Sequence, residues 1–332
     1  MQLKVLVLSV ALWLALPSGA FAAQTTPVEQ WLQRLQSAQK VQNYQGAFIY
    51  ERKGAFSTHQ IWHQVSPQGQ LMERFLQLNG PAHEVMRIDG KVTCMSAAVS
   101  DELTVVDIWP AATPKLEHLR QWYEVHALGE TRVAGQMTTV LLFSPNDQHR
   151  YPVELYLDQE TAIPLKILLL NEHGQLLERL QFVQFQAYSA QQLAANKDQL
   201  ITPSTDCVPI IEQLTVGAEE AQLDHSKADL QVSWVPPGFV LLKSHYKPSD
   251  DGSNVLSQVY SDGLAHFSIF FENIDHLEVE GGRRQFGPTA VVSRKVIHKA
   301  ESLMITVVGE IPIGSAERVV LSMQTGQEHS DD

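Results

Sequence analysis

The stretch YPVELYLDQETAIPLKILLLNEHGQLLERLQFVQFQAY, residues 151–188, decides the fold. Its short apolar runs, separated by polar turn residues, predict three β-strands joined by two tight turns. The central run, residues 163–170, is apolar at both alternating positions. Side chains alternate between the two faces of a strand, so a half-exposed sheet would show one polar face. This strand is therefore predicted to be covered on one face and shielded on the other, either as the wall of an apolar cavity in a curved sheet or inside a packed sandwich.

The segment before this stretch repeats the strand pattern. Between residues 43 and 109, short apolar runs are separated by turn residues, of which Asp89-Gly90 is the clearest hairpin signal. One amphipathic helix precedes them: Thr26 can cap it, Pro27 fits its first position, and its apolar stripe is Val28, Trp31, Leu32 and Leu35. One helix followed by many short strands predicts an antiparallel sheet wrapped on a helix, and not a parallel βαβ arrangement. The fold class is therefore mainly antiparallel β with helices (α+β).

Residues 1–22 are predicted to be an export signal. Lys4 gives a positive start, residues 5–16 form an apolar core, and residues 20–22 supply small side chains for cleavage. That core is too short to span a bilayer. We therefore expect an exported chain.

Two domains are expected on the basis of length. Residues 23–200 form the first, and residues 201–228, rich in Gln, Ala, Asp and Glu, form an interdomain linker. Residues 229–324 contain a second series of strands and a final helix, and form a smaller second domain. The tail, residues 325–332, is predicted to be disordered.

Charge and cysteine content exclude some partners and suggest one covalent link. The formal net charge is −13, which argues against a nucleic-acid partner because such partners need a basic surface. The two cysteines, Cys94 and Cys207, are expected to form a disulfide in an oxidising compartment. The alternative is two buried thiols. A redox centre is disfavoured because the chain has no Cys-x-x-Cys.

Motifs of catalysis are missing from the sequence. There is no Gly-x-Ser-x-Gly elbow, no phosphate-binding loop and no zinc-protease helix. We therefore predict no catalytic residue, no metal ligand and no cofactor.

Aromatic and aliphatic side chains on the first-domain strands have two interpretations. They form either the hydrophobic core or the lining of an apolar pocket of the kind that lipids and small ligands need. The candidate pocket residues are Phe48, Tyr50, Trp62, Phe75, Trp109, Leu165 and Ile167.

In the second domain, Phe267, Ile269 and Phe271 share one face of a predicted strand, and Phe270 lies on the other. Phe270 is either an exposed anchor for a protein partner or packs against the first domain. The candidate partner-binding residues are Trp234, Phe239, Tyr260 and Phe270. Arg283 and Arg284, on a predicted loop, are the candidate contacts for an anionic lipid.

Several blocks of this sequence together resemble one family. The blocks are Asn43-Tyr44-Gln45-Gly46, Leu78-Asn79-Gly80-Pro81, Leu155-Tyr156-Leu157-Asp158, Tyr260-Ser261-Asp262-Gly263-Leu264-Ala265 and Val307-Val308-Gly309-Glu310. They are similar to blocks of the RseB/MucB family, the periplasmic negative regulators of the sigma-E (AlgU) envelope-stress response. The resemblance covers nearly the whole mature chain.

The resemblance implies a fold and a function. The first domain would be a half-open β-barrel similar to the lipoprotein carriers LolA and LolB, and the second a smaller α/β domain. The protein would bind the periplasmic part of a membrane anti-sigma factor of the RseA or MucA type and shield it from regulated proteolysis. Lipid or lipopolysaccharide would release it, and it would form homo-oligomers. The family has no catalytic residue to carry over.

Two other function classes compete with this regulatory binding protein. A periplasmic lipid or lipoprotein carrier would explain the first domain alone, but it does not need a second domain with its own core. An enzyme acting on envelope material lacks the expected catalytic residues.

Overall fold

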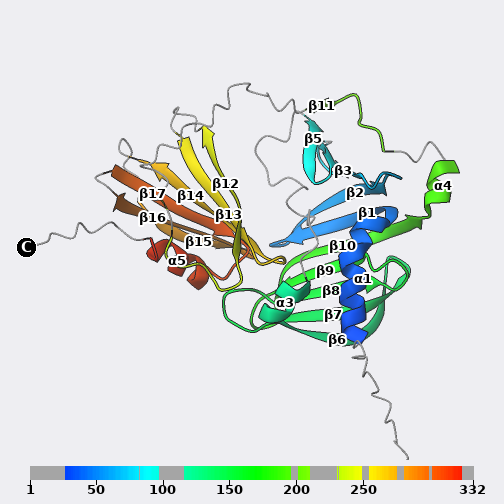
Figure 1. Ribbon diagram of the computed structural model, residues 1–332, viewed down its shortest axis with the longest axis horizontal. Helices are drawn as coiled ribbons and strands as arrows, with labels where there is room; N and C mark the ends of the chain where they lie inside the picture. Colours follow the sequence, from blue (N-terminus) through cyan, green and yellow to red (C-terminus); the bar gives the residue numbers. More distant parts are fainter. Residues whose placement is uncertain are drawn as a thin grey trace, which may run out of the picture.

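The computed structural model describes residues 27–81, 83–96, 116–195, 201–209, 230, 232–248, 254–274, 280–298 and 301–323. Two antiparallel sheets lie side by side in it (Figure 1). The first sheet has eleven strands in the order β11-β5-β4-β3-β2-β1-β10-β9-β8-β7-β6, and the second has six in the order β12-β13-β14-β17-β16-β15. The order of the first sheet ends at β11 and β6, so the described strands form an open sheet rather than a closed barrel. The predicted fold class, mainly antiparallel β with a few helices, is confirmed.

The elements of the first sheet and its helices follow the chain with few crossovers. Their bounds are α1 (Pro27–Val41), β1 (Asn43–Arg52), β2 (Ala55–Val65), β3 (Leu71–Gln77), β4 (Glu84–Ile88), β5 (Lys91–Ser96), α3 (Leu116–Trp122), β6 (Tyr123–Val133), β7 (Gln136–Pro145), β8 (Val153–Asp158), β9 (Pro164–Leu170), β10 (Leu176–Tyr188), α4 (Ala190–Ala195) and β11 (Cys207–Pro209). The second sheet comprises β12 (Val240–Pro248), β13 (Asn254–Ser261), β14 (His266–Asn273), β15 (Gly282–Phe286), β16 (Thr289–His298) and β17 (Glu301–Gly309), followed by α5 (Ile313–Leu321).

Helix α1 lies across the first sheet, as its apolar stripe predicts (Figure 1). Leu32 and Leu35 are buried against β7 and β8, while Ala38 reaches the core beneath β1 and β10. At the turn between β8 and β9, the Arg34 guanidinium donates to the carbonyl oxygens of Gln159 at 2.7 Å and Glu160 at 3.0 Å. The helix is therefore fixed by apolar contacts with the sheet and by hydrogen bonds from the Arg34 side chain to the β8–β9 turn.

The meander β8–β9–β10 confirms the three predicted strands. Leu165 is fully buried, as is Ile163 just before β9, and Ile167 packs on both core clusters of this sheet. On the opposite face of β9, Leu168 and Leu170 are only half-buried. The inward face of β9 is thus part of a packed core, and the outward face is shielded in part.

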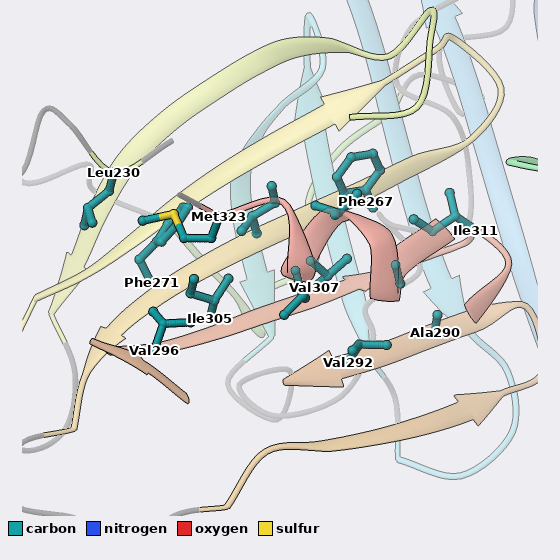
Figure 2. Packing of buried hydrophobic residues seen from close by; sticks show 14 of the residues in the cluster. Leu230, Phe267, Phe271, Ala290, Val292, Val296, Ile305, Val307, Ile311 and Met323 are labelled. Carbon is teal, nitrogen blue, oxygen red and sulfur yellow. The ribbon is translucent and has the colours of Figure 1, made fainter. Parts of the chain in front are cut away.

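The second sheet carries α5 on one face (Figure 1). Phe267 and Phe271 of β14, Ile305 and Val307 of β17, and Val292 of β16 all point toward the helix (Figure 2). The predicted shared face of Phe267, Ile269 and Phe271 is therefore confirmed, and it is the face that packs in this core. Since Phe, Ile and Val each contribute about 1.5–3 kcal/mol when fully buried, this cluster gives the second sheet a core of its own.

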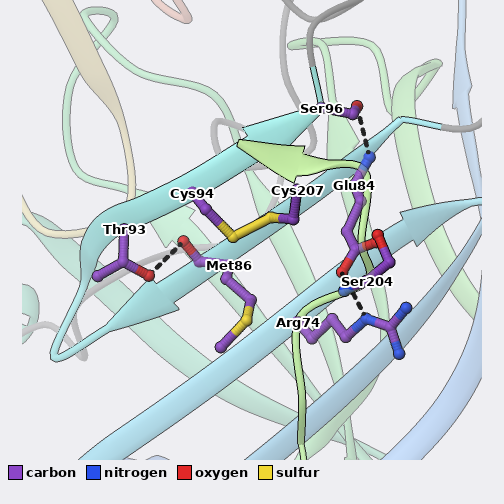
Figure 3. The surroundings of a disulfide bond; sticks show 8 residues. All are labelled: Arg74, Glu84, Met86, Thr93, Cys94, Ser96, Ser204 and Cys207. Carbon is purple, nitrogen blue, oxygen red and sulfur yellow. Dashed lines mark hydrogen bonds and ion pairs between the residues drawn. A yellow bond between two sulfur atoms is a disulfide. The ribbon is translucent and has the colours of Figure 1, made fainter. Parts of the chain in front are cut away.

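A disulfide joins Cys94 on β5 to Cys207 on β11, with the Cα atoms 5.5 Å apart (Figure 3). This confirms the predicted bond. The segment 201–209 runs over the face of the first sheet opposite the core, where Glu84 accepts a hydrogen bond from the Ser204 amide at 3.0 Å and Gln64 accepts one from the Ile201 amide at 3.1 Å. The beginning of the predicted linker is therefore attached to the first sheet, and its residues 207–209 form strand β11.

Some predictions fall outside the described residues: the export signal 1–22, Trp109 with its predicted strand, most of the linker and the tail 325–332. One is corrected. Arg283 and Arg284 lie on strand β15, which pairs with β16, and not on a loop. The loop prediction missed β15 because a five-residue strand with every residue exposed has no apolar alternation. Within the described residues, no helix is long and apolar enough to cross a membrane.

Candidate functional site at the seam between the sheets

The two sheets meet through a buried polar cluster centred on Arg150, in the connection from β7 to β8. Its side chain is fully buried. Its guanidinium donates to Oδ2 of Asp262 at 3.1 Å, to Oδ1 of Asp147 at 3.2 Å and to the carbonyl oxygen of Pro237. We call each sheet, together with its helices and connecting segments, a sheet unit. Asp262 and Pro237 belong to the unit of the second sheet, so the Arg150 side chain connects both units. We call the contacts between the two units the seam.

Asp262 is held in place by its own turn. It occupies the connection from β13 to β14, where its Oδ1 accepts hydrogen bonds from the amides of Leu264 at 2.9 Å and Ala265 at 2.8 Å. Such a turn leaves the second carboxylate oxygen free to point outward. Oδ2 accepts from the Tyr123 hydroxyl at 2.9 Å and from Arg150. A buried ion pair needs such added hydrogen bonds to offset its desolvation.

Aromatic rings surround the Arg150 guanidinium. Its carbon lies 5.2 Å from the ring centre of Trp122, 5.5 Å from that of Tyr123 and 5.2 Å from that of Phe239. Each ring face attracts the cation. Gly238, with φ +86°, lets the chain pass so close to Trp122 that a Cβ there would lie 2.2 Å from the indole nitrogen. The second sheet unit therefore contacts α3 at a position that only glycine fits.

A second group of contacts lies beside the first. His149 Nδ1 and Ser315 Oγ of α5 are 2.9 Å apart, and the His149 ring meets the edge of Trp234 at 5.2 Å between ring centres. The Arg318 guanidinium also contacts this indole, 4.0 Å from the Trp234 ring centre. Burial lowers the pKa of His149, against the opposing effect of Asp147. A neutral imidazole thus fits this part of the seam.

A third group joins β1 and β10 to the second sheet. The Arg52 guanidinium contacts Glu178 at 2.7 Å and Glu310, which follows β17, at 2.8 Å. Lys53 lies 4.3 Å from the Phe286 ring centre at the end of β15. Burial, and then the charge of Glu310, raise the pKa of Glu178 to about 7. One arginine therefore holds two carboxylates, and one of them has an unusually high proton affinity.

A cleft of about 590 Å³ opens next to the seam, between α1 and the start of β6. Its lining mixes apolar and polar side chains, among them Val28, Leu32, Arg120, Tyr123, Val125 and Asn146. Tyr123 belongs to both the cleft and the seam, because its hydroxyl donates to Asp262. Within the described residues, no group of His, Cys, Asp and Glu side chains could hold a metal ion.

The predicted pocket residues that the structure describes do not line this cleft. Phe48, Phe75 and Leu165 are fully buried in the core beneath α1, and Tyr50 and Ile167 pack against the same core. Trp62 lies on the other face of the sheet, where Arg74 covers its ring at 4.7 Å.

The predicted partner-binding residues divide between the seam and the second sheet. Trp234 and Phe239 contact His149 and Arg150 at the seam. Tyr260 stacks on Phe267 at 5.2 Å within the second core. Phe270 is half-buried on the face of β14 opposite α5. Of the predicted lipid-contacting arginines, Arg283 is exposed and paired with Glu317, and Arg284 is exposed.

Sequence reasoning missed the residues that build the seam, namely Tyr123, His149, Arg150, Arg52, Glu178 and Glu310. Arg150 and Asp262 are 112 positions apart, and no local pattern links two such positions. The one available signal was the turn Ser261-Asp262-Gly263, whose polar residues looked like an ordinary exposed turn.

Two family models match the chain: the MucB/RseB N-terminal domain over residues 27–203 and the MucB/RseB C-terminal domain over residues 224–324. The chain is 42% identical over 310 residues to the sigma factor AlgU regulatory protein MucB of Pseudomonas aeruginosa, covering 91% of this chain and 92% of that protein. It is 25% identical over 315 residues to the sigma-E factor regulatory protein RseB of Escherichia coli strain K12, covering 93% and 94%.

Solved structures show the same similarity. The structure of the Pseudomonas aeruginosa MucA/MucB complex matches with a TM-score of 0.75 and 42% identity, over 90% of this chain and 98% of that chain. A crystal structure of MucB matches with a TM-score of 0.67 and 39% identity, over 90% and 97%. The similarity thus extends over both sheets.

Proposed function

The chain belongs to the MucB/RseB family, and from that membership we propose that it is a regulatory binding protein of the sigma-E (AlgU) type. Its partner is the periplasmic part of a membrane anti-sigma factor of the RseA or MucA type. Binding represses signalling because it shields the anti-sigma factor from regulated proteolysis. The protein works in the periplasm and is not an enzyme.

One observation carries this proposal. A chain that is 42% identical to this one, and superimposes on it with a TM-score of 0.75, is solved in a complex described as MucA/MucB. The match covers 98% of that chain, so the whole binding unit has a counterpart here.

Exposed apolar side chains on the second sheet support a protein partner. Strand β12 lies at the edge of the sheet, and Val240, Leu241 and Leu242 on it are all at least 49% exposed. An edge strand offers unpaired backbone groups to another chain. Together with half-buried Phe270, this edge is our proposed contact surface for the anti-sigma factor, whereas Trp234, Phe239 and Tyr260 support it from the seam and the core.

We propose that lipid or lipopolysaccharide releases the complex, and that the curved first sheet acts as a half-open barrel, as in lipoprotein carriers. The cleft beside α1 supports a ligand site near the seam, since Tyr123 lines the cleft and also donates a hydrogen bond to Asp262 at the seam.

Arg283 and Arg284 on β15 are proposed surface contacts for an anionic lipid, and homo-oligomers are proposed as a further state. A periplasmic lipid carrier is the alternative function, and the second core argues against it.

A protection assay tests the proposal. Purified mature protein is mixed with the periplasmic part of the cognate anti-sigma factor and with the protease that makes the first regulated cut. We expect a complex in a pull-down, at least tenfold slower cleavage, and recovery of cleavage when lipopolysaccharide is added. No complex and no protection would refute the regulatory function. Transfer of lipid to an acceptor without protection would favour the carrier.

Two variants locate the contact surface in the same assay. Leu242→Glu places a charge on the exposed edge, and we expect at least tenfold weaker binding because apolar contact is lost. Leu321→Glu is the matched control, since Leu321 is similarly exposed but lies on α5, away from β12. Equal effects of the two substitutions would exclude β12 as the contact surface.

A further inference from the structure

Arg52 forms a bridge between three elements at the end of the seam. It pairs directly across the sheet with Glu178, its neighbour on β10, and it also reaches Glu310 from the second sheet unit. The side chains of all three residues are largely buried, with exposed fractions of 16%, 15% and 21%. Two carboxylates therefore share this one guanidinium, and the charge of Glu310 disfavours ionisation of Glu178. This repulsion is strong where water is scarce.

Within the described part of the chain, the neighbouring elements bring no second cation to Glu178. From β1, the groups facing Glu178 are Arg52 and the Tyr50 hydroxyl, which shares a hydrogen bond with it. On the other flank, β9 places the apolar Leu169 opposite Glu178. Lys53 is adjacent in the chain but is directed to the Phe286 ring and the Gln285 carbonyl oxygen.

The second sheet unit covers this group from above. A Cβ at Gly287, in the turn after β15, would lie 3.4 Å from Cγ of Arg52 and 3.6 Å from the carbonyl oxygen of Leu177. The turn therefore lies directly over the residues beside Glu178. Docking of the second unit thus brings Glu310 close and takes water away, and both effects favour a protonated Glu178.

We propose that Arg52, Glu178 and Glu310 form a proton-controlled latch, in which uptake of one proton by the carboxylate pair strengthens the docking of the two sheet units on each other. This inference concerns the chain itself and does not depend on the identity of its partner. With one proton shared, the group is neutral, and Arg52 holds both units together. Without it, the two carboxylates repel each other across the seam.

The direction of the pH effect follows from linkage. Glu178 binds a proton more tightly in the docked form, where its pKa is about 7, than in the separated form. The contribution of the latch to the free energy of docking is therefore fully present at a pH below the pKa that Glu178 has in the separated form. It is lost as the pH rises through about 7. One proton limits the change in the ratio of docked to separated molecules to about tenfold per pH unit.

His149, at the other part of the seam, acts in the opposite direction, because burial lowers its pKa. A comparison of wild type with Glu178→Gln at the same pH cancels this contribution. The glutamine side chain of that variant is neutral at every pH. The variant should therefore match the wild type only below about pH 4, near the ordinary pKa of a glutamate. It should dock increasingly more strongly than the wild type as the pH rises to about 7.

Energy transfer between dyes measures docking in the mature full-length protein. The dyes are attached at Glu130→Cys on β6 and Ile297→Cys on β16, both exposed positions far from the latch. From pH 5 to pH 9, we expect the wild-type ratio of docked to separated molecules to fall relative to Glu178→Gln. This ratio should fall by at most about tenfold per pH unit, and we expect it to become constant above about pH 7–8. Glu51→Gln is the control, because Glu51 pairs with Arg179 on the same two strands but on the other face. It should keep the wild-type response.

A carbon-13 NMR titration of the Glu178 carboxyl keeps the test decisive if the docked form dominates at every pH. We expect a midpoint near pH 7 in the wild type and a clearly lower midpoint in Glu310→Gln. An ordinary midpoint in the wild type, or the same midpoint in Glu310→Gln, would overturn the latch. So would a pH response in the dye experiment that Glu178→Gln leaves unchanged.

Discussion

Nη1 of Arg150 and Oδ2 of Asp262 lie 3.1 Å apart, both side chains are fully buried, and the two residues belong to different sheet units. Without docking, Arg150 would keep only Asp147 as an anionic partner, and Asp262 would lose Arg150. Removing one partner of a buried ion pair costs several kcal/mol, so the pair favours the docked arrangement. This makes the seam a specific joint rather than a loose contact between two independently folded parts.

Replacement of Asp262 tests this joint. Asp262→Asn keeps an oxygen for the turn but removes the charge, so that Arg150 retains one anionic partner, Asp147, whose side chain is 21% exposed. We expect the free energy of unfolding to fall by about 3–5 kcal/mol, the usual effect of breaking a buried pair. Urea denaturation monitored by the fluorescence of Trp122 and Trp234, which flank the seam, measures it.

The control for this experiment is Glu317→Gln, which breaks the Arg283–Glu317 pair on the surface. Arg283 is 66% exposed there, and such pairs contribute about 0–1 kcal/mol. An effect of Asp262→Asn no larger than that of Glu317→Gln would show that the buried pair does not hold the seam.

The sequence predicted most strands because periodicity is local. Alternation in β14 correctly placed Phe267 and Phe271 on one face, which packs in the core. Two cysteines in a chain expected to be exported correctly predicted the disulfide. The seam could not be predicted in this way. Arg150 follows a polar stretch that looks solvent-exposed, and its partner is 112 residues away. Apolar alternation likewise cannot separate a packed core from a pocket wall, so Phe48 and Phe75 fitted both interpretations.

Gly238 gives a steric test of the same joint. Gly238→Ala must accept a left-handed φ of +86° and a Cβ that overlaps the Trp122 ring. We expect a loss of more than about 2 kcal/mol, because the left-handed conformation alone costs about 1–2 kcal/mol and the ring must also move. Faster hydrogen–deuterium exchange in α3 would show that the damage lies at the seam.

Gly174→Ala is the matched control for Gly238→Ala. Gly174 also has a left-handed φ, +73°, but a Cβ there would meet no atom within 4 Å. Gly174→Ala should lower the free energy of unfolding only by the conformational strain, and it should leave hydrogen–deuterium exchange in α3 unchanged. If the two substitutions cost the same, the approach of Gly238 to Trp122 contributes nothing.

Reduction of the disulfide tests the attachment of segment 201–209. The bond closes a loop with a sequence separation of 113, for which chain entropy predicts a contribution of about 4–5 kcal/mol at most. We expect a smaller loss than this limit, since Gln64 and Glu84 still bind the amides of Ile201 and Ser204. Denaturation with and without reductant measures the loss. The double variant Cys94→Ser/Cys207→Ser should show the lower stability and no response to reductant; a stability equal to that of the oxidised wild type would contradict the prediction.

Acidification should weaken the part of the seam around His149. Burial lowers the pKa of this imidazole, so the docked form prefers it neutral. The stability that it contributes is present above its ordinary pKa of about 6.5 and is lost as the pH falls through that value toward the lowered one. Thermal unfolding in the Glu178→Gln background, where the opposing latch is absent, should show a melting temperature that falls from pH 8 to pH 5. Adding His149→Gln should reduce this dependence but not remove it, because burial also lowers the pKa of His59 to about 4. His126→Gln, which removes an exposed imidazole of β6, should leave it intact. A dependence that His149→Gln leaves unchanged would assign the acid sensitivity to other groups, such as His59.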